Sequence, residues 1–142
     1  MATKKLVRTS LLIAWLALTI YLSLQPGTES GETSRWLARR VADIFGISMA
    51  QFGSFHAWLR EMAHFGVHMV LAILAYRSLV LYVGVKRALI WTFIGCGVVA
   101  ICDEAAQLVA TGRASEMVDA LMNLLGVETG MIIGYLITKD KS

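Results

Sequence analysis

Residues 103–126 read DEAAQLVATGRASEMVDALMNLLG, and they place polar side chains inside two otherwise apolar runs. Asp103, Glu104 and Gln107 interrupt the first run, and a second acid and amide interrupt the next. Inside a lipid bilayer such groups are energetically expensive and usually serve a function. The stretch therefore predicts a polar cluster held within membrane helices, and we interpret the rest of the chain as its support.

The composition of the chain is that of a membrane protein. Of its 142 residues, 57% are hydrophobic and 16% are charged, whereas soluble domains carry about 25% charged residues. The length suits one compact domain, which we assign to residues 1–142. The chain is basic, with 13 lysines and arginines against 10 acids, but these cations flank apolar segments as orientation signals do. We therefore expect no nucleic-acid partner.

Four apolar runs are each close to the ~20 residues that a helix needs to cross a bilayer. Because backbone groups in lipid must be hydrogen-bonded internally, helices are the expected spans. The predicted fold is an all-α bundle of four transmembrane helices, at residues 6–24, 60–84, 88–110 and 117–138. The first run resembles a signal peptide, but no small-x-small cleavage site follows it, so we predict a retained helix.

Residues 25–59 are predicted to form an outer loop that contains a short amphipathic helix. Around Trp36 and Ile44, apolar side chains share one helical face, and Arg39 and Arg40 lie on the other. This pattern is typical of a helix that lies in the membrane interface. Packing of the same helix against the bundle is an equally good interpretation.

The basic residues predict the orientation of the bundle. Eight lie near the two termini or the connection between the second and third spans, and five lie on the opposite side. The excess marks the first side as cytoplasmic. With a helical rise of ~1.5 Å per residue, polar residues from all four spans then reach a similar depth in the outer leaflet. The candidate binding residues near this level are Gln25, Arg60, His64, Gln107, Asp119 and Asn123, and Arg113 is a further candidate in the loop above them.

The last span also carries a stripe of small residues. Gly126, Gly130 and Gly134 are spaced four apart, on the face that continues from Asp119 and Asn123. Small residues at this spacing let two membrane helices approach closely. We predict that these glycines form a helix-packing seam and that the two polar residues point into the bundle.

The chain resembles the VanZ-like family of small bacterial membrane proteins. The matching residues are Ser23-Leu24-Gln25-Pro26-Gly27, Arg60-x-x-Ala63-His64-Phe65, Asp103-Glu104-x-x-Gln107, Gly112-Arg113 and Asp119-x-x-x-Asn123-x-x-Gly126. They cover the whole chain and keep the motif order. The family name comes from low-level resistance to the glycopeptide teicoplanin. The resemblance therefore implies an envelope role. Together with the basic-residue count, we expect a multi-pass protein of the bacterial cytoplasmic (inner) membrane with both termini cytoplasmic.

Several residues of the cluster are candidates for chemistry. His64 with Asp103 or Glu104 could act as an acid–base pair, because adjacent buried acids shift proton affinity. The same groups could instead form a closed network that orders the helices. His64 and His68 lie four apart, but the His-Glu-x-x-His form is absent, and we expect neither a metal nor a cofactor.

Arg113 follows a glycine in a short loop above the cluster, and with Arg60 it could grip a phosphate or carboxylate. A salt bridge from Arg113 to Glu116 or Asp119 is the alternative. The leading hypothesis is binding or modification of an anionic lipid headgroup or a lipid-linked envelope precursor. An intramembrane hydrolase or transferase, and a structural subunit with a membrane-protein partner or a second copy, are the alternatives. Enzymatic activity stays open.

Overall fold

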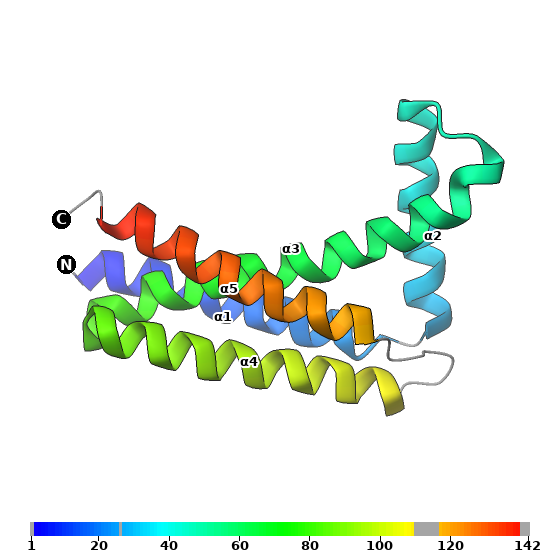
Figure 1. The fold of residues 1–142 in the computed structure, drawn as a ribbon. Coiled ribbons are helices and arrows are strands. Elements are labelled where there is room, and N and C mark those ends of the chain that lie inside the picture. The colour runs from blue at the N-terminus through cyan, green and yellow to red at the C-terminus, as the bar shows by residue number, and fades with distance from the viewer. Residues whose placement is uncertain (1, 26, 110–116, 140–142) are drawn as a thin grey trace.

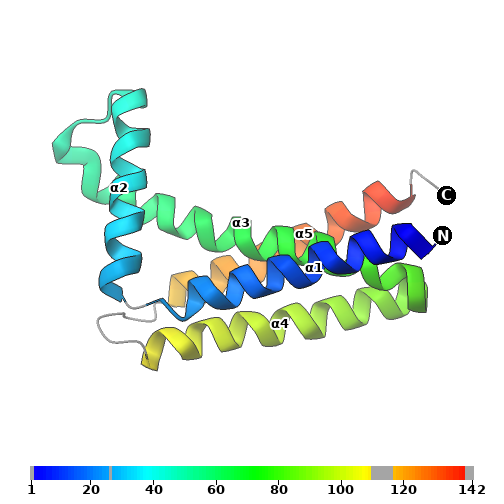
Figure 2. The ribbon, with the colours of Figure 1, turned by 180° about the vertical axis from the view of Figure 1, so that it is seen from behind.

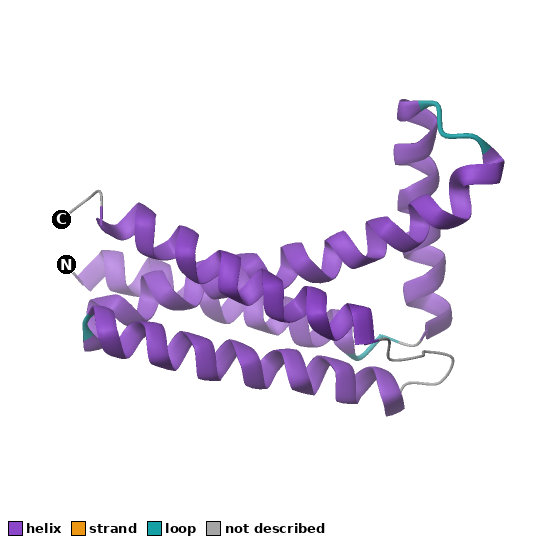
Figure 3. Ribbon diagram, in the orientation of Figure 1, coloured by secondary structure: helices purple, strands orange, loops and turns teal. Residues whose placement is uncertain are grey.

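The computed structural model describes residues 2–25, 27–109 and 117–139, and the regular structure within these ranges is helical (Figure 3). In chain order the helices are α1 (Ala2–Ser23), α2 (Gly27–Phe45), α3 (Met49–Val83), α4 (Val85–Val109) and α5 (Met117–Lys139). Within the described residues, α1, α3, α4 and α5 are long and apolar enough to cross a membrane. The predicted all-α fold with four spans is confirmed.

Helix α3 is the central element, because it contacts each of the other four helices. Figure 1 shows α1, α4 and α5 lying along its C-terminal part, with both chain termini and the α3–α4 turn at one end of the bundle. The opposite end, where α1 and α4 finish and α5 begins, is called the polar end below. Seen from behind in Figure 2, α2 stands across the N-terminal part of α3 beyond the polar end.

Two glycines allow the sharp turns at the ends of α2 and α3. Gly46 follows the last residue of α2 with φ 66°, and Gly84 separates α3 from α4 with φ 76°. These positive φ angles favour glycine, since a Cβ atom would be strained there. A single residue can therefore reverse the chain between two membrane helices.

The segment 25–59 differs from the predicted loop. Helix α2 occupies residues 27–45, and α3 begins at Met49, well before the predicted start at residue 60. The local reason is a start signal at Ser48, whose backbone amide donates to Gln51 Oε1 at 3.4 Å. The chain also has a single proline, Pro26, so no proline interrupts either helix. The location of α2 in the membrane interface stays a prediction.

The interior of the bundle is formed by small and aliphatic side chains of three helices. Leu71, Ala72 and Ala75 of α3 pack with Cys96 of α4 and Val127 of α5. Partly buried side chains of α1, among them Trp15, cover this cluster. The apolar core therefore lies between the polar end and the termini, and it holds the four spans in register.

The glycine stripe of α5 faces α3. A Cβ atom on Gly126 would collide with the Phe65 carbonyl oxygen, and one on Gly130 would collide with the Met69 carbonyl oxygen. At Gly134 a Cβ would lie 3.1 Å from the Tyr76 ring. Because α5 presents no side chains along this line, its backbone packs directly on α3. This close approach sets the positions of Asn123 and Asp119, which lie about one and two turns before the stripe.

Candidate functional site

Asp103 of α4 is bonded to two other membrane helices. Its Oδ1 accepts a hydrogen bond from the Ser23 hydroxyl at the end of α1. Its Oδ2 accepts one from Asn123 Nδ2 of α5, at 3.2 Å. The Asp103 carboxylate is buried, and a buried charge needs such partners to offset its lost hydration. One acid thus ties three spans together.

Asn123 is the centre of the polar network. It is fully buried, and its Nδ2 also donates to Glu104 Oε1 at 2.9 Å. Its Oδ1 lies 3.1 Å from His64 Nδ1, which is also 3.5 Å from Asp103 Oδ2. Both of these oxygens are acceptors, so Nδ1 is the ring nitrogen of His64 that carries hydrogen. The amide thereby links α3, α4 and α5.

An ion pair forms the part of the network nearest the polar end. Arg60 Nη2 of α3 lies 3.1 Å from Asp119 Oδ2 of α5, with side-chain exposures of 41% and 1%. His64 Nε2 approaches the same carboxylate oxygen at 3.8 Å. The buried acid therefore has a cationic partner that reaches toward the polar end.

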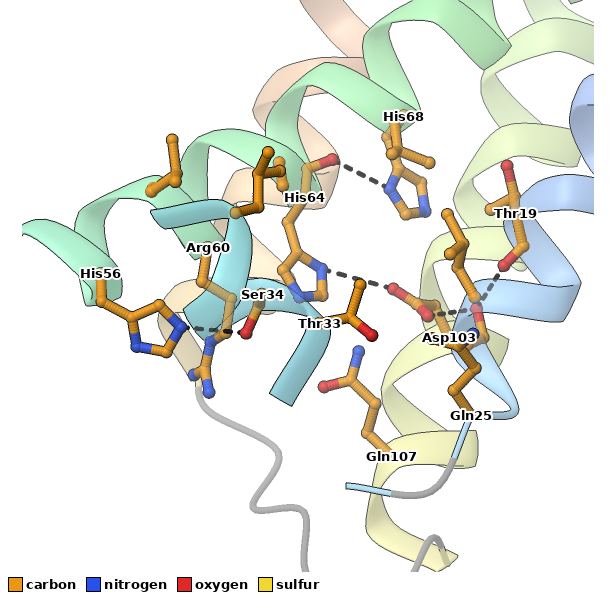
Figure 4. Close-up of a pocket in the computed structure, with 16 residues that line it drawn as sticks. Thr19, Gln25, Thr33, Ser34, His56, Arg60, His64, His68, Asp103 and Gln107 are labelled. Atoms are coloured by element: carbon orange, nitrogen blue, oxygen red, sulfur yellow. Dashed lines mark hydrogen bonds and ion pairs between the residues drawn. The ribbon is translucent and has the colours of Figure 1, made fainter. Parts of the chain in front are cut away.

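A cavity of about 240 Å³ opens beside this network, between α1, α2, α3 and α4 (Figure 4). Its polar lining combines side chains from all four of these helices with that of Gln25, which follows α1. They are Thr19, Ser23, Gln25, Thr33, Ser34, His56, Arg60, His64, His68, Asp103 and Gln107. Leu22, Leu37, Leu59 and Val67 are among its apolar lining residues. The cavity thus joins charged, polar and apolar surfaces in one space.

The predicted site residues divide into two groups around this cavity. Gln25, Arg60, His64, Asp103 and Gln107 line it. The other described candidates are not among the lining residues. Asp119 is bonded to the lining residue Arg60 and Asn123 to the lining residue Asp103, whereas Glu104 accepts a hydrogen bond from Asn123. The remaining candidate, Arg113, lies outside the described residues.

Comparison with known protein families matches residues 9–138 to the family described as VanZ/LLP1. The chain belongs to the VanZ/LLP1 family. No curated protein and no solved structure gave a significant match. With its four apolar helices, the chain is a multi-pass membrane protein of this family.

The sequence did not predict the part of the cavity that α2 contributes. Thr33 and Ser34 line it from α2, and His56 lines it from the early part of α3. The His56 ring Nε2 and the Ser34 hydroxyl lie 2.9 Å apart and connect the two helices. The pattern of Ser48 followed by Gln51 signals a helix start, and it would have placed His56 on the same helix as Arg60 and His64.

One set of side chains in this VanZ/LLP1 protein has the composition of a metal site. Possible ligand atoms of His64, Asp103 and Glu104 lie within 4.8 Å of one another. In the structure, however, both carboxylates accept hydrogen bonds from the Asn123 amide. A cation would have to displace these hydrogen bonds. The expectation that the protein binds no metal stays a prediction.

Proposed function

We propose that this VanZ/LLP1 protein binds an anionic amphiphile, either a lipid headgroup or a lipid-linked envelope precursor. One observation carries the proposal: a single cavity between membrane helices joins Arg60 to neutral polar groups and to apolar walls. Such mixed lining is typical of small-molecule pockets, in which apolar walls supply affinity and a few polar groups orient the ligand. An amphiphile matches both surfaces at once.

The size of the cavity favours one headgroup over a whole lipid. Its volume of about 240 Å³ lies below the ~300–1,000 Å³ typical of pockets for drug-sized ligands. The acyl or prenyl chain would therefore lie along the apolar helix surfaces outside. Gln25 and Gln107 bring amides to the cavity, and Ser34 brings a hydroxyl. These groups suit the neutral oxygens of a headgroup.

Arg60 is the described residue best suited to the anion. Its guanidinium lines the cavity and is oriented by the buried Asp119. Planar guanidinium groups match the geometry of phosphate and carboxylate oxygens. Arg113 would supply a second guanidinium from the loop that follows α4.

The charge distribution supports an outward-facing polar end. Eight basic residues lie on the side of the bundle that holds the two termini, and five lie on the other side. The positive-inside rule therefore assigns both termini to the cytoplasm. The cavity then lies in the outer leaflet of the bacterial cytoplasmic membrane. Glycopeptides such as teicoplanin act at the outer envelope surface, so an envelope role of this kind follows from the proposal.

Lipid selectivity in nanodiscs tests the proposal. We expect wild-type protein to retain phosphatidylglycerol over phosphatidylcholine by native mass spectrometry, and Arg60→Gln to lose this preference. Arg87→Gln, near the opposite end of α4, is the matched control and should keep it. The Arg60 substitution also removes the ion-pair partner of the buried Asp119 carboxylate. The double variant Arg60→Gln/Asp119→Asn removes both charges, so it separates an effect on binding from an effect on folding. Equal selectivity in wild type and both Arg60 variants would contradict the proposal.

A second candidate function is an intramembrane hydrolase or transferase. The observation that favours it is that His64 and Asp103 both line the cavity, with Nδ1 and Oδ2 3.5 Å apart. A carboxylate that holds Nδ1–H orients the ring so that Nε2 can take and return a proton. Incubation of purified protein with bacterial lipids, followed by mass spectrometry, tests it. Product formation that His64→Gln abolishes supports the enzyme, and unchanged lipids favour binding or a structural role.

A further inference from the structure

His68 is a buried side chain of the cavity that the polar network does not use. It is 1% exposed and lies one helical turn beyond His64 on α3. Its Nδ1 is 3.2 Å from the His64 carbonyl oxygen. A carbonyl oxygen only accepts hydrogen bonds, so Nδ1 carries the ring hydrogen. In the neutral ring, Nε2 is then an acceptor.

The Nε2 atom of His68 is buried and has no hydrogen-bond partner among the described residues. Figure 4 shows it turned toward the space in which Thr19 and Asp103 lie. Neither neighbour is placed to satisfy it. The Thr19 hydroxyl donates to the Trp15 carbonyl oxygen at 2.9 Å, and an ionised carboxylate has no hydrogen to donate. Buried polar atoms are normally paired, so a donor from outside the chain fits here.

The depth of His68 restricts where that donor sits on a ligand. His68 follows Arg60 by eight residues on α3, which corresponds to about 12 Å along the helix. If Arg60 holds the phosphate, Nε2 lies toward the hydrocarbon side of it. A diacyl phospholipid offers ester oxygens there, which are acceptors. A lysophospholipid offers the free hydroxyl of its glycerol, and a hydroxylated acyl chain offers a hydroxyl close by.

We propose that His68 Nε2 accepts a hydrogen bond from the bound amphiphile and that this amphiphile carries a hydroxyl on the hydrocarbon side of its phosphate. This assignment rests on the proposed function, because it takes the ligand to be an anionic amphiphile held by Arg60. It makes His68 a specificity-determining residue that distinguishes hydroxylated lipids from ordinary diacyl lipids.

The test compares ligands that differ by one hydroxyl. Protein in phosphatidylcholine nanodiscs is titrated with 1-oleoyl lysophosphatidic acid and with its 2-deoxy analogue, and dissociation constants are measured. Wild type should prefer the hydroxylated lipid by roughly three- to tenfold, the effect of one hydrogen bond. A second pair, phosphatidic acid with and without a 3-hydroxy group on one chain, distinguishes a chain hydroxyl from a glycerol hydroxyl.

Three variants complete the design. His68→Leu removes the acceptor and should erase the preference. His68→Gln keeps an acceptor near the Nε2 position and should retain part of it, which also covers the case in which the leucine variant does not fold. Thr92→Val removes a buried hydroxyl of α4 that does not line the cavity and should leave the preference unchanged.

Either of two results would overturn the assignment: no preference in wild type within both lipid pairs, or an undiminished preference in the folded His68→Leu variant. Equal binding of the paired lipids leaves the proposed function intact, because the phosphate is still recognised. If phosphatidylglycerol and both lysolipids all fail to bind wild type, the proposed function fails together with this assignment.

Discussion

The Asp103 carboxylate of α4 accepts a hydrogen bond of 3.2 Å from the Asn123 amide of α5, inside the bundle. The same amide nitrogen bonds Glu104, and the amide oxygen lies beside His64. Two acids and a histidine from two helices are thus held by one neutral side chain. Through this one side chain the network connects α3, α4 and α5.

Replacement of Asn123 with leucine should strongly destabilise the fold. The substitution keeps the branched shape of the side chain but removes hydrogen bonds to two carboxylates and a histidine, and each buried polar group left unpaired costs about 1–3 kcal/mol. We expect the free energy of unfolding in detergent to fall by at least ~2 kcal/mol. Leu121→Ala, at a position of the same helix that is 56% exposed, is the control. A similar loss in both variants would argue against a central role for Asn123.

Two serines of the bundle allow a comparison of charged and neutral hydrogen bonds. Ser23→Ala removes a donor from the Asp103 carboxylate, and a hydrogen bond to a charged group contributes about 1.5–3 kcal/mol. Ser78→Ala removes a hydroxyl that lies 3.1 Å from the Thr9 hydroxyl, a neutral pair worth about 0.5–1.5 kcal/mol. Thermal unfolding should therefore show a larger decrease in stability for Ser23→Ala than for Ser78→Ala. The reverse order would contradict the hydrogen bond assigned between Ser23 and the Asp103 carboxylate.

The α3–α5 contact should not tolerate a methyl group. Gly130→Ala places a Cβ against the Met69 carbonyl oxygen and 2.9 Å from the Ala72 Cβ, so the helices must move apart. Overpacking of this kind costs about 1–3 kcal/mol. Gly97→Ala is the matched control, since nothing lies within 4 Å of its Cβ position. Equal unfolding temperatures for the two variants would contradict close packing of α5 against α3 at Gly130.

Cysteine accessibility tests the orientation of the protein. In a background with Cys96→Ala and Cys102→Ala, a membrane-impermeant maleimide should label Ala50→Cys at the start of α3 in intact cells. Thr3→Cys, at the start of α1, should react only after lysis, because the basic residues near the termini favour the cytoplasmic side. Both positions are exposed in the structure. The opposite pattern would reverse the orientation and move the cavity to the inner leaflet.

Several features of the site could be predicted because they depend on local sequence. Helical spacing places Asp119, Asn123 and the glycines on one face of α5, and the depth of Arg60 and His64 follows from the helical rise. The contribution of α2 could not be predicted in this way. The pairing of Ser34 with His56 depends on the angle at which the chain folds back between α2 and α3. A hydropathy pattern carries no information on the angle between two helices.

The sequence by itself determined that the chain crosses the membrane four times and that polar groups of all four spans gather near one end. These properties follow from the length and hydropathy of each run and from the helical rise, which are local. Only the tertiary structure decided which atoms meet: that Asn123 joins Asp103, Glu104 and His64, and that the Nε2 atom of His68 faces a cavity. The physical reason is that helix rotation and separation are set by packing, here by the close approach of the α5 glycines to the α3 backbone.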